Sequence, residues 1–264
     1  MASDTKKDRI LLFIPAYNCE NQITRVLDSL DARVMKYVDE VIVINNRSTD
    51  GTEEAVKKYK TGHWSLPLKL LRNEENYGLG GSHKVAFDYA IKNRFDYVIV
   101  LHGDDQGNIE DFLPVLKKRI YRRYDAVLGA RFMLNSKLIG YSKLRTVGNI
   151  VYDFLFAFAI GQRVFDLGSG LNMYDVNLLK DRFYFRFPDN LMFNYCMVLA
   201  IGYYNQVVRF WPVSWKETDQ VSNVKLTSQA IKVLKMLFKY IDCPTSIRGE
   251  YRDKKVRAYR AEEV

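Results

Sequence analysis

The chain has 264 residues, which is enough for one large α/β domain or for a domain with a short C-terminal extension. Its hydrophobic content of 48% is ordinary for a globular protein with a core, and its net charge of +9 favours an anionic partner, such as a phosphorylated substrate, a phospholipid surface or nucleic acid. The three distant cysteines form no CxxC pair, so they indicate neither a disulfide framework nor a zinc site and favour a reducing cytoplasm.

Residues 1–8 are polar and charged, unlike a signal peptide, and the longest apolar stretch, residues 150–160, contains Asp153 and is too short to span a bilayer. The basic residues are not interleaved with aromatics in a known nucleic-acid-binding pattern, so nucleic acid is not expected as a partner. Much of the excess positive charge lies near the C-terminus, which predicts either a solvated tail or a contact with an anionic partner: Arg248, Arg252, Lys254, Lys255, Arg257 and Arg260.

In the first half of the chain, short apolar runs alternate with helical patterns. We predict strands at residues 9–16, 40–44, 68–72 and 97–101, and helices at residues 20–36 and 52–59. Residues 76–81, NYGLGG, predict a glycine-rich loop, and a helix follows to residue 92, with His83 as a solvated or capping residue at its start. Strands without polar alternation predict a mostly parallel sheet with helices on both faces.

The second half of the chain is less regular. Strands are predicted at residues 126–130 and 206–213, and helices at residues 142–160 and 226–241. We therefore expect an α/β catalytic domain over residues 1–225, followed by a C-terminal amphipathic helix and basic tail over residues 226–264.

Polar clusters follow three of the predicted strands: PAYN at 15–18, NNRSTDGT at 45–52 and HGDDQ at 102–106. Ligands of such sheets bind at the carboxyl ends of the strands. Asp104, Asp105 and Gln106 offer the oxygen ligands that Mg²⁺ or Mn²⁺ prefers beside a diphosphate. Paired acids in a loop also serve commonly as turn or cap residues, so the position after an apolar strand is what favours a metal.

Four segments carry a family resemblance: IPAYNCENQI, VIVINNRSTDGT, NYGLGGSHKVAFDYA and VIVLHGDDQ. In this order and spacing, the chain resembles the inverting glycosyltransferases of family 2 with the GT-A fold, over residues 9–131 and more loosely to about residue 240. The later stretches LGARF, LRTVGN and DLGSGLNMY are most similar to polyprenyl-phosphate glycosyltransferases of the dolichol-phosphate mannose synthase type.

The resemblance implies roles on the donor side. Asp104 and Gln106 match the metal-binding positions for Mg²⁺ or Mn²⁺, and Asp104 and Asp105 are the expected catalytic acids. His102 replaces the first Asp of the usual DxD pattern; we expect it to support the site, with a phosphate contact or metal coordination as alternatives. The expected nucleotide-sugar set, which also includes Asp104, is Pro15, Ala16, Tyr17, Asn18, Glu20, Asn45, Ser48 and Gly80.

On the acceptor side, basic residues are expected around a phosphate, because a guanidinium binds phosphate oxygens bidentately. An acceptor phosphate is already anionic and needs no general base, whereas an acceptor hydroxyl normally does. Asp175, Asp181 and Asp189 are the candidate bases, although each also suits a cap or turn; Asp189, in the turn-like FPDN, is the one to test. The expected acceptor set is Arg131, Arg145, Lys225, Ser169 and Asn172.

We therefore expect a metal-dependent, inverting transfer of a sugar from a UDP- or GDP-linked donor to a polyprenyl phosphate. The alternatives are a sugar hydroxyl on a glycan or lipid-linked oligosaccharide as acceptor, and a nucleotide-sugar-binding pseudoenzyme. The acceptor lies in a bilayer, so we expect peripheral binding at the cytoplasmic membrane face. The basic amphipathic helix at 226–241 and the apolar stretch 150–160 are candidate surfaces, although both also suit core packing. The aromatic-rich second half is a candidate contact for a homo-oligomer.

Overall fold

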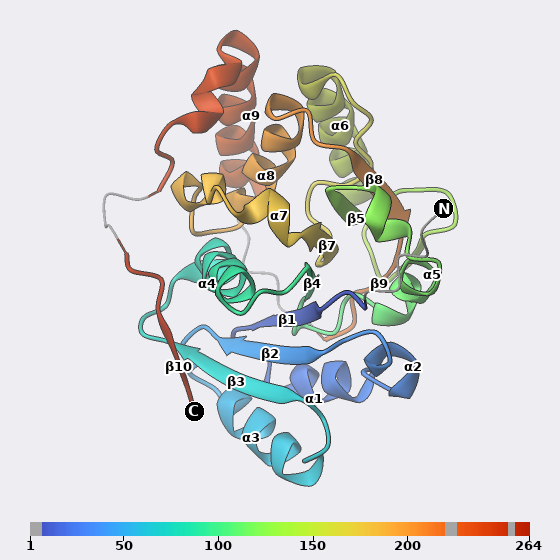
Figure 1. Cartoon of the computed structure of the whole chain (residues 1–264). Helices are drawn as coiled ribbons and strands as arrows, with labels where there is room; N and C mark the ends of the chain where they lie inside the picture. The colour runs from blue at the N-terminus through green and yellow to red at the C-terminus, as the bar shows by residue number, and fades with distance from the viewer. Residues whose placement is uncertain (1–6, 220–225, 253–256) are drawn as a thin grey trace, which may run out of the picture.

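The computed structural model describes residues 7–219, 226–252 and 257–264, with the side chains of residues 226–229 left out. Within these ranges one large sheet runs through the molecule, in the order β10-β3-β2-β1-β4-β7-β5-β8 (Figure 1). Its strands are β1 Ile10–Ala16, β2 Glu40–Asn45, β3 Leu68–Asn73, β4 Tyr97–Leu101, β5 Ala126–Ala130, β7 Leu171–Asp175, β8 Val208–Pro212 and β10 Ala261–Glu263.

The predicted mostly parallel sheet is confirmed. β1 pairs in parallel with β2 and β4, β2 with β3, and β5 with β8. β7 is antiparallel to β4 and β5, and the edge strand β10 is antiparallel to β3. A separate parallel pair joins β6 Lys137–Ile139 to β9 Ser214–Lys216.

Helices cover both faces of the sheet, because successive strand residues point to opposite sides. In β1, Leu11 and Phe13 face one buried cluster, and Ile10, Leu12 and Ile14 face the other. The helices on the second face are α1 Glu20–Asp28, α2 Ala32–Met35, α3 Thr52–Gly62 and α5 Leu113–Lys117. The first face is covered by α4 Gly78–Lys92, α6 Lys143–Ile160, α7 Val176–Leu179, α8 Met192–Tyr203 and α9 Leu226–Asp242. None of the described helices has the length and apolarity needed to cross a membrane.

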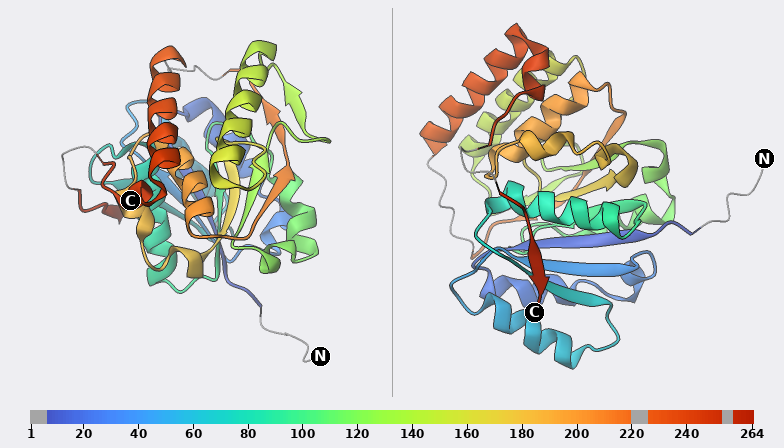
Figure 2. Two further views of the ribbon diagram at one scale, coloured as in Figure 1. Left: turned by 90° about the horizontal axis from the view of Figure 1, so that it is seen from above. Right: turned by 60° about the vertical axis from the view of Figure 1, so that its left-hand side comes forward.

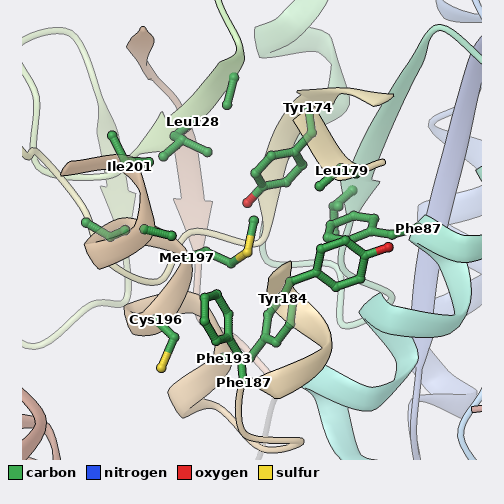
Figure 3. Close-up of a cluster of buried hydrophobic side chains, with 14 of the residues drawn as sticks. Phe87, Leu128, Tyr174, Leu179, Tyr184, Phe187, Phe193, Cys196, Met197 and Ile201 are labelled. Carbon is green, nitrogen blue, oxygen red and sulfur yellow. The ribbon is translucent and has the colours of Figure 1, made fainter. Parts of the chain in front are cut away.

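The first-face core is rich in aromatic rings (Figure 3). Phe87 of α4 packs edge-on against Tyr184 at a centroid distance of 5.1 Å, and Tyr184 lies in the short 3₁₀ helix Phe183–Arg186. Residues beyond 225 add to this same core, including Val233, Leu237 and Tyr259. The predicted domain boundary at residue 225 itself lies outside the described residues, and α9 packs on the catalytic half.

Three local predictions are wrong. Residues 20–36 form two helices, because Asp31 accepts bonds from the amides of Arg33 and Val34 and so begins α2 anew. Most of the predicted glycine-rich loop is the first turn of α4, which starts at Gly78. His83 is consequently not a solvated or capping residue: it is 1% exposed on α4, and burial lowers its pKa to about 3.

Candidate active site

The three polar clusters predicted from the sequence lie together at the carboxyl ends of the neighbouring strands β1, β2 and β4. The Gly103 amide, after β4, donates to the Pro15 carbonyl at 3.1 Å, and the Asn46 amide, after β2, donates to the Ala16 carbonyl at 2.9 Å. The ends of β1, β2 and β4 are thus held side by side by backbone bonds. This edge is where an α/β sheet binds its ligands.

Several side chains predicted to contact the nucleotide join two loops to each other. Asn18, at φ +49°, accepts from the Thr49 amide at 2.8 Å, and its own amide donates to Ser48 Oγ at 3.0 Å. Glu20 accepts from the Gly51 amide at 3.0 Å. These contacts hold the loop after β1 and the loop after β2 together.

Two more of the predicted nucleotide-binding residues differ in how available their side chains are to a ligand. Asn45 Oδ1 accepts from the Ser48 amide at 2.9 Å, and its Nδ2 donates to Glu53 at 2.8 Å, so this amide is largely used within the protein. Tyr17, in contrast, is 51% exposed, as a ring that stacks on a base must be.

Asp104 is the acid best placed for a cation. Burial, helped by the nearby charge of Asp105, raises the pKa of its carboxyl to about 6, and its Oδ1 accepts from the Gln106 amide at 3.2 Å. A cation beside it would favour the ionised form. Asp105, at φ +58°, forms an ion pair with Arg25 at 2.7 Å, which does not support the predicted role as a metal or catalytic oxygen donor.

The described residues contain no cluster of three or more His, Cys, Asp and Glu that could hold a metal by itself. Mg²⁺ is nonetheless commonly held by one or two carboxylates together with substrate phosphates. Asp104, with the adjacent Gln106, fits that pattern, because the remaining oxygens would come from the donor diphosphate.

His102 is the first residue after β4 and lies two residues before Asp104 in the chain. A Cβ added at Gly170 would lie 2.6 Å from His102 Cγ, so the ring occupies the space that the glycine leaves. Burial lowers the pKa of His102 to about 4, and its Nε2 is buried with no hydrogen-bond partner among the described residues. A neutral, enclosed imidazole fits the expected supporting role.

The two predicted acceptor arginines meet at a residue that sequence reasoning missed, Tyr141. The guanidinium carbons of Arg131 and Arg145 lie 5.7 and 4.5 Å from the centroid of its ring. Arg131 is 8% exposed and forms a bidentate pair with Asp166, at 2.7 and 2.8 Å. Arg145 pairs with Glu217 at 2.7 Å and remains 32% exposed, so Arg145 is the more accessible cation.

The rest of the predicted acceptor set is buried or outside the described residues. Asn172 Nδ2 donates to the Ser169 carbonyl at 2.8 Å, and Asn172 Oδ1 accepts from the Gly129 amide at 3.2 Å. Both residues brace the junction of β5 and β7, which does not support a direct ligand contact. Lys225 lies outside the described residues.

Asp189, the predicted general base, has a different set of contacts. Its carboxylate accepts from Lys84 at 2.6 Å, Arg257 at 2.5 Å and the Tyr259 hydroxyl at 2.8 Å, and its side chain is 6% exposed. Both carboxylate oxygens are thus occupied by donors of the protein itself and lie away from solvent, so neither is open to take a proton from an acceptor hydroxyl. The contacts therefore argue against the predicted role as a base.

Gly80, predicted for the nucleotide, faces the same turn rather than open space. Its amide donates to the Asp189 carbonyl at 2.7 Å, and a Cβ at this position would lie 2.4 Å from the Pro188 carbonyl oxygen. The glycine therefore permits close backbone packing inside the protein.

Several residues of this region were missed from the sequence. Asp166 opens the quoted stretch DLGSGLNMY, so its position before the glycines was an available signal. The guanidinium carbon of Arg131 lies 4.9 Å from the centroid of the Trp215 ring. Trp215 also forms an isolated β-bridge with Gly107, which connects the segment after Asp104–Gln106 to the surroundings of Arg131. No local pattern marks Tyr141 or Trp215, because their roles depend on chain segments far apart.

An acid-ended strand beside two polar strand-end loops, on a mostly parallel sheet covered on both faces, fits a glycosyltransferase with the GT-A fold. Residues 12–183 match the family "Glycosyl transferase family 2", and the chain belongs to this family. The predicted family and GT-A fold are thereby confirmed.

Relatives and solved structures give the range of similarity. A UDP-N-acetylglucosamine–dolichyl-phosphate N-acetylglucosaminyltransferase of Methanococcus voltae is 24% identical over 65% of this chain and 71% of its own length. A dolichyl-phosphate beta-glucosyltransferase of Trichomonas vaginalis is 24% identical over 77% of this chain and 63% of its own length. The structure of glucosyl-3-phosphoglycerate synthase from Mycobacterium tuberculosis with UDP has a TM-score of 0.62 and 16% identity, and covers 97% of this chain and 87% of that chain.

Proposed function

We propose that this glycosyltransferase transfers a sugar, with inversion and with the help of Mg²⁺ or Mn²⁺, from a nucleotide diphosphate donor to a polyprenyl phosphate at the cytoplasmic face of a membrane. The observation that carries the proposal is Asp104, a partly buried carboxylate with a raised pKa, which lies where β4 ends beside the loops after β1 and β2. Dolichyl-phosphate transferases among the relatives support the acceptor class, and the UDP-bound structural neighbour supports a UDP-linked donor.

In this proposal Asp104 and Gln106 would hold the ion beside the donor diphosphate. The ion, when bound, would neutralise the charge that develops on the departing nucleotide. A related GT-A structure contains Mn²⁺ together with UDP, which supports this choice of metal. Tyr17 would stack on the base, and the Asn18–Ser48 contact would keep its loop in place.

For the acceptor, Arg145 is the cation that would position the phosphate, because its side chain is partly exposed and lies beside Tyr141. An acceptor phosphate attacks without a general base, which agrees with the engagement of Asp189 elsewhere.

One observation favours the second candidate, transfer to a sugar hydroxyl: Arg131 has its guanidinium already neutralised by Asp166. Turnover with a polyprenyl phosphate but not with its dephosphorylated alcohol would support the first candidate, and the reverse would support the second.

A binding experiment tests the donor site. Thermal unfolding is measured with UDP or GDP, with and without Mn²⁺, because a ligand that binds only the folded state raises the unfolding temperature. We expect a nucleotide-dependent rise that is larger with Mn²⁺, and we expect Asp104→Asn to lose the Mn²⁺-dependent part. Asp105→Asn is the matched control and should keep it, since Asp105 pairs with Arg25. No shift with either nucleotide, with or without metal, would refute the proposal.

A further inference from the structure

Helix α6 carries an exposed apolar stripe that a folded core does not explain. The stripe consists of Leu144, Val147, Val151, Phe154 and Phe158, whose exposed fractions range from 52% for Val151 to 82% for Leu144. Their spacing of three and four residues puts them on one side of the helix. The other side is the packed one, where Asp153 and Phe156 are buried. Contiguous exposed apolar surface of this kind marks an interaction site.

Helix α9 lies beside α6 and adds positive charge. The Tyr152 hydroxyl of α6 donates to the Ala230 carbonyl of α9 at 3.2 Å, and both helices project from the same end of the molecule (Figures 1 and 2). α9 exposes Ile231, Phe238 and Ile241 between three exposed lysines, Lys232, Lys235 and Lys239. The two helices contain two acids, of which Asp153 is buried and Asp242 is the last residue of α9.

We propose that the α6 stripe inserts into the acyl region of an anionic bilayer while the lysines of α9 contact its headgroups. Apolar rings that enter the membrane beside cations that stay at the interface are what an interfacial amphipathic surface requires. Each lysine near an anionic surface adds to the attraction. The sequence left both residues 226–241 and residues 150–160 as candidate membrane surfaces; the exposures favour insertion of α6, with α9 as the electrostatic partner.

The inference rests on the proposed function and gives it an orientation. Arg145 lies in the first turn of α6, one residue after Leu144 of the stripe. With the stripe at the acyl boundary, Arg145 is held near the level of the headgroup phosphates. A polyprenyl phosphate has its own phosphate at that level, so the docked helix presents the accessible arginine to the acceptor.

Charge argues for a bilayer rather than a second copy of this chain. A two-fold symmetric contact places the same patch of both copies together. Such a contact through α6 and α9 would bring Lys232, Lys235 and Lys239 of both copies into one interface, and like charges across an interface are unfavourable. An anionic lipid surface satisfies the apolar stripe and the lysines at once.

Co-sedimentation of the full chain with vesicles tests the inference. The vesicles are phosphatidylcholine alone and phosphatidylcholine mixed with phosphatidylglycerol. Phe154→Ser combined with Phe158→Ser should weaken binding to vesicles at least about tenfold. Burying two phenylalanine side chains in the bilayer is worth more than the 1.4 kcal/mol that corresponds to a tenfold change. Lys232→Glu combined with Lys235→Glu should weaken binding only to the anionic vesicles. Trp64→Ser, at an aromatic residue that is 88% exposed on another part of the surface, is the control and should bind as the wild type does.

The outcomes separate docking from catalysis. The inference is overturned if the wild type binds neither vesicle, if the phenylalanine variant binds as well as the wild type while keeping its thermal stability, or if sedimentation shows a dimer that this variant dissociates. Transfer to a water-soluble, short-chain polyprenyl phosphate without vesicles should be the same for the wild type and the phenylalanine variant. Such transfer without vesicle binding refutes the docking face alone, and vesicle binding without transfer to any polyprenyl phosphate refutes the acceptor assignment alone.

Discussion

Asp189→Asn should destabilise the fold rather than remove a catalytic base. Lys84 has a wholly buried side chain, and its ammonium donates to Asp189 at 2.6 Å, to the Phe187 carbonyl at 2.5 Å and to the Tyr259 hydroxyl at 3.1 Å. Removing one partner of a buried pair leaves an uncompensated charge and costs about 3–5 kcal/mol. At about 2–4 °C per kcal/mol for a chain of this size, the unfolding temperature should fall by roughly 10 °C.

The loss should also depend on pH. Burial lowers the pKa of Lys84 from its ordinary value of 10.5, and without Asp189 the pKa falls further, so below that ordinary value the native variant binds fewer protons than the unfolded chain. Stability then rises with pH. The difference between variant and wild type should therefore shrink as the pH rises toward the ordinary lysine pKa of 10.5, measured by urea or thermal unfolding at each pH.

Asp88→Asn is the matched control on the same helix. Asp88 pairs with Arg182 and Lys92 on the solvent side of α4, and such exposed pairs are worth about 0–1 kcal/mol. Adding Lys84→Met to Asp189→Asn should recover most of the lost stability, because the buried cation is gone. The reasoning is refuted if Asp189→Asn unfolds within 2 °C (about 1 kcal/mol) of the wild type yet loses transfer activity about a hundredfold, since that is the behaviour of a general base.

Three further substitutions test other parts of the structure. Burial raises the pKa of Asp153 from 3.8 to about 8, so its carboxyl stays protonated in the native state while it ionises in the unfolded state, and wild-type stability falls as pH rises through this range. Asp153→Asn should therefore raise the unfolding temperature by an amount that grows from pH 5 to pH 8; a gain that is constant with pH would contradict this. Gly170→Ala should cost about 1–3 kcal/mol by pushing on the His102 ring, and His102→Ala should relieve most of it; an equal cost in both backgrounds would show that the clash is elsewhere. Tyr259→Ala, at 6% exposure, should cost about 3 kcal/mol or more in denaturant unfolding, whereas a solvated tail would give a change within about 0.5 kcal/mol.

Much of the fold is predictable because the strands are local apolar runs. The ranges 97–101 and 126–130 match β4 and β5, and the first three strands differ from their predictions by a single residue each. α8 was missed because it is buried nearly all round, so no amphipathic period marks it. β10, Ala261–Glu263, was missed because its polar residues have no strand signature and pair only with the sheet edge.

The sequence by itself determined the family, the order of the main elements and the three strand-end loops, because these depend on short runs of residues and their order along the chain. Only the tertiary structure decided which charges meet: Arg131 with Asp166, Lys84 with Asp189 and Asp105 with Arg25. Each pair joins segments at least 35 residues apart, and the longest separation is 105 residues. Propensity and periodicity act over a few residues, so they place a charged side chain on an element but cannot specify its partner or tell whether an apolar helix face ends in the core or in solvent.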